Sequence, residues 1–373
     1  MKNTKKILLA PLDWGLGHVT RCIALYDWMT INGMEVHWAL SNETAQALVK
    51  SYFPHAKIIS SPAYNITYAQ KSQFFFSKLL RQSPKILKVI KAENQWLKQQ
   101  QKLHRFDLIL SDNRYGMYHL EVPSIFIGHQ IYLRSGKQDW MDTLATQIQK
   151  KYLKRFDDIW KLDDPTLKIA GELAWRRKDD YPSIGVTSQF MSLSKNDVDS
   201  ISTNSTSKKN LLFVLSGPEP QRQLLETAIR NEVQHLTDYH LILIRGTLAP
   251  YSDETDAFFD EIVDLSKGKE LLKYIQDAEL VISRSGYSTL MDLIYLQKKM
   301  LLIPTPGQTE QIYLAEYFQE QTWAIQTSQE NLNLSTSIEL ALALSPPIIK
   351  VSYSEKHFIK LLNRKLESTK GAL

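Results

Sequence analysis

The sequence contains a single cysteine, Cys22, among its 373 residues. One thiol cannot form an intramolecular disulfide, and a metal site built from cysteines alone is excluded with it. A free cysteine behaves most often as a small buried hydrophobic side chain. We therefore interpret Cys22 as a core residue in a reducing compartment.

Long apolar runs are also absent, because no stretch approaches the roughly 18 apolar residues of a membrane-spanning helix. Three lysines at positions 2, 5 and 6 precede the apolar run 7–12, which looks like the start of a signal peptide. That run is too short for a signal-peptide core and ends in Asp13-Trp14-Gly15. We expect a first β-strand there, in a cytoplasmic protein.

Neither sign of charge is in large excess, with 45 Lys and Arg against 40 Asp and Glu and a net charge of +5. A balance this modest does not force nucleic-acid binding. The 43% of hydrophobic residues supplies enough apolar material for folded cores, and the length suits two domains better than one.

Short apolar segments alternate with helical patterns along the chain, in two series separated by a polar segment at 192–210. Strands are expected at 6–12, 35–40, 57–60, 107–110, 124–127, 211–215, 241–244, 280–283 and 300–303. Repeated strand–helix alternation predicts parallel sheets covered by helices on both faces. The expected fold class is α/β, with two Rossmann-like, doubly wound domains at 1–190 and 191–352. A last helix at about 353–368 is expected to pack back on the first domain.

The loop after the first strand contains Gly15 and Gly17, followed by His18. Two glycines allow the backbone to approach a ligand closely, and the free amides of a helix start favour an anion. A dinucleotide-binding loop would have a third glycine where Thr20 stands, which disfavours a nicotinamide oxidoreductase. His18 is either a helix-capping residue or a catalytic base, since imidazole titrates near neutral pH.

Polar residues gather after two later strands of the first half. Asp112 and Arg114 follow one strand, and His129 follows the next. Because ligands bind beyond the carboxyl ends of parallel strands, Arg114 and His129 are candidates for an acceptor site, as are Gly15 and Gly17. Asp112 is expected to orient His18 and to stabilise its protonated form. Helix capping by Asp112 and a structural role for His129 are the alternatives.

The second half has similar loops, and these predict a binding site for a sugar nucleotide. Hydroxyl and glycine residues at a helix start suit a diphosphate, and acid and amide side chains suit ribose and sugar hydroxyls. A surface position is the alternative for Asp292. The candidate donor-binding residues are Gly217, Arg245, Ser285, Gly286, Tyr287, Ser288, Asp292, Glu310 and Gln311.

The segment 282–311 is similar to the donor-binding region of MurG-like, family-28 glycosyltransferases. The resemblance is carried by Ser283-Arg284-Ser285-Gly286, the acid Asp292, Ile303-Pro304 and Gln311, and by the N-terminal loop Gly15-Leu16-Gly17-His18. It implies the GT-B fold, in which two Rossmann-like domains face a cleft and the C-terminal one binds a UDP-sugar. It also implies transfer with inversion, without a metal or other cofactor.

Carried over by position, the resemblance assigns ribose to Asp292, the sugar to Gln311 and the diphosphate to Ser285 and Gly286. The loop 265–271 would face the base, and His18 would be the catalytic base. The family usually has glutamate where Asp292 stands and a second glutamine where Ile312 stands. Its Gly-Ser-Gln-Gly run is replaced by residues 216–221. These differences leave the sugar open and argue against the peptidoglycan enzyme itself.

The segment 71–105 has nine Lys or Arg against one acid, together with Phe74–Phe76 and Trp96. Basic residues beside exposed aromatics suit anionic lipid headgroups, which would make the acceptor lipid-linked and the protein peripheral on the inner face of the cell membrane. An amphipathic helix with a solvated basic face is the alternative. No nucleic-acid partner is expected. A UDP-sugar 2-epimerase and a non-catalytic sugar-nucleotide-binding module remain alternative functions.

Overall fold

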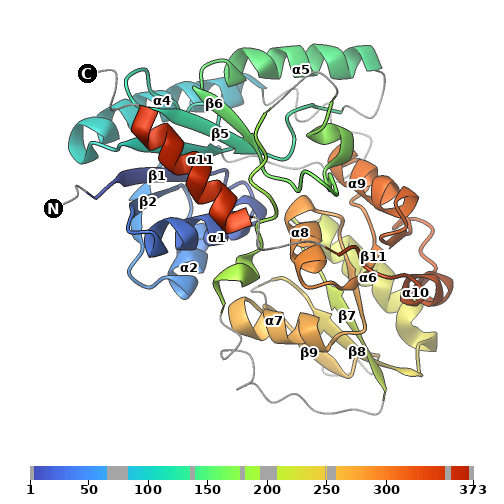
Figure 1. The fold of residues 1–373 in the computed structure, drawn as a ribbon. Coiled ribbons are helices and arrows are strands. Elements are labelled where there is room, and N and C mark those ends of the chain that lie inside the picture. The colour runs from blue at the N-terminus through green and yellow to red at the C-terminus, as the bar shows by residue number, and fades with distance from the viewer. Residues whose placement is uncertain are drawn as a thin grey trace. The chain divides into compact units, whose positions relative to one another are not determined.

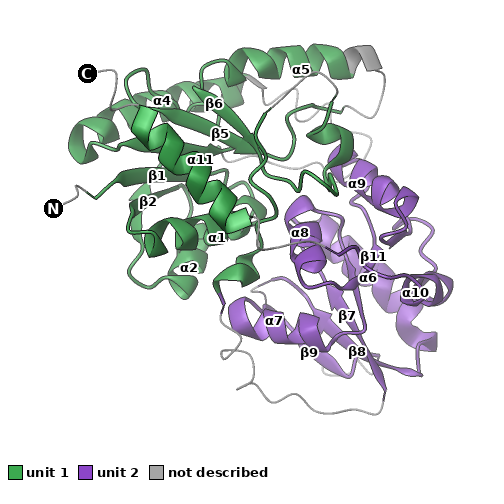
Figure 2. Cartoon of the chain, viewed as in Figure 1, with its two compact units in different colours: residues 1–67, 77–192, 350–373 green, residues 68–76, 193–349 purple. Residues whose placement is uncertain are grey.

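The computed structural model describes residues 4–64, 83–134, 139–176, 181–193, 208–247, 249, 258–348 and 354–368. The chain divides into two compact units (Figure 2). Unit 1 consists of residues 1–67, 77–192 and 350–373, and unit 2 of residues 68–76 and 193–349.

Unit 1 is built on a six-stranded parallel sheet in the order β3-β2-β1-β4-β5-β6 (Figure 1). Its strands are β1 (Lys6–Pro11), β2 (Glu35–Leu40), β3 (Lys57–Ser60), β4 (Leu108–Asp112), β5 (Ser124–Gly128) and β6 (Asp158–Lys161). Its longer helices are α1 (Gly17–Ile31), α2 (Glu43–Tyr52), α4 (Ser83–His104), α5 (Asp139–Leu153) and α11 (Ser354–Ser368). The strand order reverses direction at β1, so β1 and β4 form the switch point where such sheets bind ligands.

The central strands of unit 1 are buried on both faces, which explains their nearly continuous apolar sequences. The last helix, α11, packs on this unit through Phe358, which is completely buried. Its ring centroid lies 5.9 Å from that of Trp28 on α1 and 6.1 Å from that of Trp160 on β6. The end of the chain thus completes the core of unit 1.

Unit 2 repeats this architecture with the strand order β12-β11-β10-β7-β8-β9. Its strands are β7 (Lys209–Val214), β8 (Tyr239–Ile244), β9 (Glu261–Val263), β10 (Leu280–Ser283), β11 (Lys299–Leu302) and β12 (Ile325–Gln326). Its longer helices are α6 (Gln221–Glu232), α7 (Gly268–Asp277), α8 (Tyr287–Tyr295), α9 (Thr309–Glu320) and α10 (Leu334–Leu342). Here β7 and β10 form the switch point.

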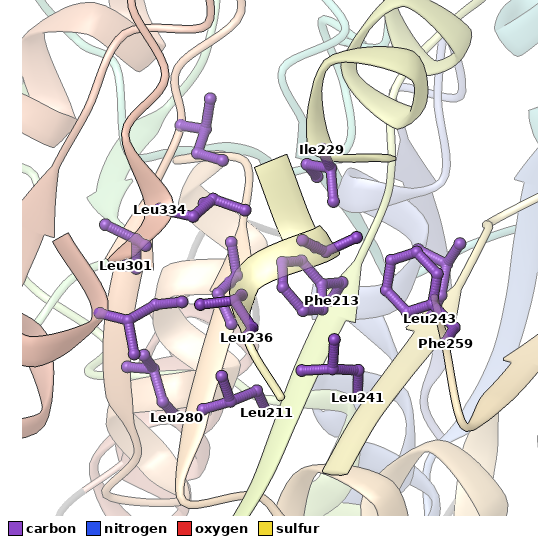
Figure 3. Close-up of a cluster of buried hydrophobic side chains, with 14 of the residues drawn as sticks. Leu211, Phe213, Ile229, Leu236, Leu241, Leu243, Phe259, Leu280, Leu301 and Leu334 are labelled. Atoms are coloured by element: carbon purple, nitrogen blue, oxygen red, sulfur yellow. The ribbon is translucent and has the colours of Figure 1, made fainter. Parts of the chain in front are cut away.

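A hydrophobic core fills unit 2 between the sheet and helices α6 and α10 (Figure 3). Phe213 on β7 lies at its centre and is fully buried. Its ring meets that of Phe259 edge-on, with the centroids 5.5 Å apart. This packing joins β7 to the segment that leads into β9.

The predicted α/β class with two doubly wound parallel sheets is confirmed, and all nine expected strands are present. The sequence analysis missed β6, β9 and β12. Each of these forms an edge of its sheet, and β9 and β12 are only half-buried. Most of the expected linker at 192–210 lies outside the described residues.

Candidate functional site

His18 projects from the first turn of α1, directly after the loop that follows β1. The helix begins at Gly17, and its N-cap position is Leu16, which makes no side-chain capping bond. His18 therefore does not serve as the N-cap. Its imidazole instead turns towards the end of β4, where Nδ1 lies 3.2 Å from Oδ2 of Asp112. The side chain of His18 keeps 21% of its surface exposed, whereas that of Asp112 is completely buried.

Arg21 joins these two residues, one turn along α1 from His18. Its Nε donates to Asp112 Oδ2 at 2.7 Å, and its Nη2 donates to Oδ1 of the same carboxylate. Nη2 also lies 2.7 Å from Nδ1 of His18, and Nη1 lies 2.7 Å from Nδ1 of His129. The guanidinium thus connects a carboxylate with two imidazoles. We call His18, Arg21, Asp112 and His129 the unit 1 cluster.

The charges of the unit 1 cluster are set by burial and pairing. Burial alone would raise the pKa of the Asp112 carboxyl, but the Arg21 guanidinium and His18 outweigh it and hold the pKa well below its usual range. Asp112 is therefore a carboxylate at neutral pH. Cys22 packs against it, with Sγ 3.5 Å from Oδ2. Burial, followed by the charge of Asp112, raises the pKa of the Cys22 thiol well above its usual value, so it stays neutral.

Arg21 was not among the site residues predicted from the sequence, although its spacing of three residues from His18 places both on one side of a helix. The contact with Asp112 depends on the pairing of β1 with β4, which brings Pro11 opposite Asp112. His129, which follows β5, is buried and enters the unit 1 cluster through Arg21. Gly15 in the neighbouring loop and Gly17 at the start of α1 are exposed.

Arg114, expected at an acceptor site, lies in a separate buried network. Its side chain is completely buried, and its Nε donates to Glu93 on α4 at 2.7 Å. Its Nη groups donate to the backbone carbonyls of Ala39 and Pro62 and to the Ser61 hydroxyl. Arg114 therefore ties β2 and the loops after β3 and β4 to α4, and this placement favours a structural role over contact with an acceptor.

In unit 2, the loops after β7, β10 and β11 converge on a buried arginine, Arg284. Its Nη1 donates to the carbonyls of Ile303 and Pro304, and its Nη2 donates to the carbonyl of Gln221. Gln329 also accepts from Nη2 through Oε1 at 2.6 Å. Burial lowers the pKa of Arg284 to about 10, which leaves the residue charged at neutral pH. Arg284 thus fixes the three loops in one arrangement.

The candidate donor-binding residues of α8 and α9 are held next to Arg284. The hydroxyl of Ser285 donates to the carbonyl of Gln311 at 2.7 Å, and Oε1 of Gln311 accepts from the Thr305 amide at 2.9 Å. Gly286 caps α8 in an extended conformation, and a Cβ placed on it would lie 4.0 Å from Nε2 of Gln311. The helix start and the amide donor of Gln311 are therefore neighbours.

The other donor-binding candidates differ in their surroundings. Tyr287 and Asp292 are buried within α8, whereas Ser288 and Glu310 are half-buried at the starts of α8 and α9. Gly217 has a φ of 102°, and a Cβ built there would meet nothing within 4 Å.

Arg245, also a donor-binding candidate, lies in an ion network at the end of β8. Its Nε donates to Glu226 at 2.9 Å and its Nη1 donates to Asp264 at 2.6 Å. Glu226 also accepts from Arg222 at 2.6 Å and from Arg230 at 2.9 Å. These contacts give Arg245 a structural setting of its own, in which it braces the loop after β8.

Comparisons with known proteins agree with this architecture. Residues 211–352 match the model of the glycosyltransferase family 28 C-terminal domain. The UDP-N-acetylglucosamine–N-acetylmuramyl-(pentapeptide) pyrophosphoryl-undecaprenol N-acetylglucosamine transferase of Clostridium botulinum is 23% identical over 354 residues, covering 93% of this chain and 90% of that protein. The corresponding transferase of Streptococcus uberis is 33% identical over 141 residues, covering 35% of this chain and 36% of that protein.

Solved structures share the fold over nearly the whole chain. The glycotransferase of kitacinnamycin superposes with a TM-score of 0.67 at 15% identity, covering 98% of this chain and 96% of that one. Acinetobacter baumannii MurG gives a TM-score of 0.57 at 13% identity, covering 97% of this chain and all of the other. The spinosyn rhamnosyltransferase SpnG, complexed with thymidine diphosphate, gives 0.61 at 13% identity, with coverages of 97% and 96%.

The two doubly wound sheets and these relationships define a glycosyltransferase of the GT-B fold. Residues 211–352 match the C-terminal domain of glycosyltransferase family 28, and over most of its length the chain is similar to MurG-type transferases.

Proposed function

We propose that this protein transfers a sugar from a UDP-sugar to an acceptor hydroxyl with inversion at the anomeric carbon, and that His18 is the catalytic base. The observation that carries the proposal is the partly exposed imidazole of His18 above the buried carboxylate of Asp112, with 3.2 Å between Nδ1 and Oδ2. A buried carboxylate orients an imidazole and stabilises its protonated form. The switch point of a parallel sheet is also where such a pair meets substrate.

The proposed reaction is a single displacement. The acceptor hydroxyl loses its proton to His18 while its oxygen forms a bond to the anomeric carbon. The bond from that carbon to the diphosphate oxygen breaks, and UDP leaves with the bonding electrons. Attack opposite the leaving group inverts the anomeric centre.

Unit 2 is proposed to hold the donor. The start of α8, beside Ser285 and Gly286, is a helix N-terminus, whose dipole favours negative charge, as the leaving diphosphate requires. Oε1 of Gln311 is occupied by the Thr305 amide, which leaves its Nε2 as a donor for a sugar hydroxyl. Asp292 is proposed to accept from the ribose. We propose that these groups stabilise the leaving UDP without a metal ion or other cofactor.

A lipid-linked acceptor is proposed from two observations. The names of the curated relatives specify a pyrophosphoryl-undecaprenol acceptor. In addition, α4 presents a row of exposed basic residues, namely Lys85, Lys88, Lys91, Lys98 and Lys102. Basic residues near an anionic membrane contribute about 1 kcal/mol each to binding. Within the described residues, none of the helices has the length and apolarity needed to cross a membrane.

The aromatic part of the membrane hypothesis needs correction. Trp96 is half-buried and packs against the core cluster of unit 1, so it is not an exposed aromatic. Phe74–Phe76 lie outside the described residues. Among the apolar residues of α4, Ile90 and Leu97 are buried, but Leu87 is 50% exposed. The surface of α4 proposed to meet lipid is therefore its basic face together with Leu87.

Vesicle sedimentation tests this surface. Wild type should bind vesicles containing phosphatidylserine more tightly than neutral vesicles, and the K88E/K91E double variant should lose most of that preference. The matched control is K356E/K360E on α11, which changes the net charge by the same amount at exposed positions. An equal loss of lipid preference in both double variants would show that binding depends on net charge and not on α4. No lipid preference in wild type would contradict membrane docking.

The identity of the donor nucleotide is tested by ligand binding. Thermal-shift titrations with UDP, GDP, TDP, ADP, CMP and NAD, with and without Mg²⁺, identify the nucleotide, since a ligand at 100 times its Kd adds about 2.7 kcal/mol of stability. UDP alone should stabilise the protein, and Mg²⁺ should make no difference. A response to TDP instead would leave the fold assignment unchanged but would make the donor a TDP-sugar. No response to any nucleotide would contradict the proposal.

The variant His18→Ala should retain the thermal shift with UDP but lose about 10²–10⁴-fold in transfer rate, the usual contribution of a positioned base. The measurement is turnover of the UDP-sugar with a polyprenyl-linked acceptor, read as released UDP. Unchanged turnover would remove His18 from the mechanism. Retained UDP binding without turnover in wild type, for every acceptor tried, would favour the non-catalytic module.

A further inference from the structure

The position of Arg21 raises a question about the protonation of His18. Nδ1 of His18 has two close neighbours, Nη2 of Arg21 at 2.7 Å and Oδ2 of Asp112 at 3.2 Å. A guanidinium only donates, and a carboxylate at neutral pH only accepts. Nδ1 can accept from Arg21 without a proton, or donate to Asp112 with one, but it cannot do both at once.

The distances and the bonding of Asp112 favour the first arrangement. The contact with Arg21 is 0.5 Å shorter than that with Asp112. Asp112 is already engaged by Arg21 through both carboxylate oxygens, and Oδ2 also faces the Cys22 thiol. Arg21 has only 1% of its side-chain surface exposed, so water does not compete for its donors. In this arrangement a neutral His18 carries its proton on Nε2.

We propose that Arg21 is a positioning residue that sets the tautomer of His18. In the resting protein, His18 has a lone pair on Nδ1 and a proton on Nε2. The same guanidinium sets His129 in the same way, through the 2.7 Å contact of Nη1 with its Nδ1. This inference rests on the proposed function, in which His18 is a base. An imidazole with a proton on Nε2 cannot accept another proton there, so this resting tautomer of His18 is not the active base.

The active form follows from a small rearrangement within the unit 1 cluster. Nη2 of Arg21 releases Nδ1 of His18 while it keeps its bond to Oδ1 of Asp112. One proton leaves Nε2 for water and another is taken up on Nδ1, so the net charge does not change. Nδ1–H then donates to Oδ2 of Asp112, and Nε2 presents its lone pair to the acceptor hydroxyl.

Arg21 also places a positive charge beside His18. Among the described residues of unit 1, Arg21 on α1, Asp112 at the end of β4 and His129 after β5 lie next to His18, and the thiol of Cys22 on α1 contacts Asp112. The neutral thiol contributes no charge. The positive charge of Arg21, and its hold on Asp112, both oppose formation of the His18 imidazolium. Replacing Arg21 by a neutral residue removes both effects.

Nitrogen NMR of the intact protein, labelled with ¹⁵N in its histidine rings, reads the tautomer directly. His18 is assigned as the signal lost in His18→Gln. At neutral pH and without substrate, the wild-type His18 signal should show a protonated Nε2 and an unprotonated Nδ1. In Arg21→Met it should show the reverse, because Asp112 becomes the only partner of Nδ1. A wild-type His18 with its proton on Nδ1 would overturn the proposal, even if Arg21→Met fails to fold.

The pH profile separates positioning from a merely structural role. In Arg21→Met the acidic limb of kcat/KM should move to higher pH by about 1–3 units, the effect of removing a neighbouring charge. Arg21→Lys keeps a positive charge but not the paired donors of a guanidinium. In this variant the acidic limb of kcat/KM should lie close to its wild-type pH. A uniform loss at all pH values with the limb unmoved would contradict the proposal. Since the tautomer is measured without substrate, its result stands apart from whether UDP-sugars are turned over.

Discussion

At the scale of single residues, Asp112 is the group whose replacement should be felt most in folding. The variant Asp112→Asn leaves the Arg21 guanidinium buried without its carboxylate. Breaking a buried pair in this way costs about 3–5 kcal/mol, much more than the loss of a surface pair. We expect that decrease in the free energy of unfolding, measured by urea denaturation at neutral pH.

A control for this variant is the residue just before the same strand. Asp107 pairs with Lys5 at the surface, where the two side chains are 30% and 29% exposed. Asp107→Asn should cost no more than about 1 kcal/mol. Equal losses in Asp112→Asn and Asp107→Asn would show that burial of the Arg21–Asp112 pair adds nothing. Because Asp112→Asn is expected to destabilise the fold, His18→Ala, at a partly exposed residue, is the better probe of catalysis.

The residues of the unit 1 cluster show what the sequence could and could not reveal. His18 and Asp112 could be paired in advance because each follows a strand, and carboxyl ends of parallel strands meet at one edge. The contact between them is present, while its catalytic role stays a prediction. Arg21 could not be found in this way. On a helix it looks like an ordinary solvated cation, and only the register of β1 with β4 buries it against Asp112.

At the scale of secondary-structure elements, the edge of the unit 1 sheet contains a charge pair between strands. Glu35 on β2 accepts from Lys57 on β3 at 2.7 Å and from His37 on its own strand at 2.8 Å. Hydrogen bonds from Lys57 and then His37 lower the pKa of Glu35 from 4.5 to about 2. The pairing favours the ionised form in the folded state.

The sign of the pH dependence follows from that shift. Because the folded pKa lies below the unfolded one, the stabilisation by Glu35 is complete above about pH 4.5 and is lost as the pH falls towards 2. Wild type should therefore be more stable than Glu35→Gln at pH 6, and the difference in Tm should shrink as the pH approaches 3. A difference that stays constant across this range would show that packing, not ionisation, stabilises the edge.

Elements at the sheet edges were also the ones that sequence patterns missed. β9 contains three residues and β12 two, and neither has the continuous apolar run of a central strand. β6 has four residues, of which the outer two, Asp158 and Lys161, are charged. An edge strand is paired on one side only and is often short, so its periodicity is too brief to recognise. The central strands, buried on both faces, were recognisable because burial requires apolar residues throughout.

At the scale of the whole molecule, the two units are proposed to divide the reaction, with the base in unit 1 and the donor site in unit 2. Each has its own buried core. Phe358 on α11 fills the core of unit 1 against Trp28 and Trp160. Phe213 fills that of unit 2 against Phe259 (Figure 3). Both phenylalanines are completely buried.

Truncating each phenylalanine tests this division with a matched pair of changes. Removing a buried phenylalanine side chain costs about 3–5 kcal/mol, and the cost falls on the unit whose core contains it. Phe358→Ala should lower the Tm of unit 1 while UDP continues to stabilise the other transition. Phe213→Ala should instead weaken UDP binding, because β7 pairs with β10, which leads into Ser285 and Gly286 of the proposed donor site. The measurement is differential scanning calorimetry with and without UDP. If Phe358→Ala abolished the UDP response while Phe213→Ala retained it, the donor site would have to be placed in unit 1.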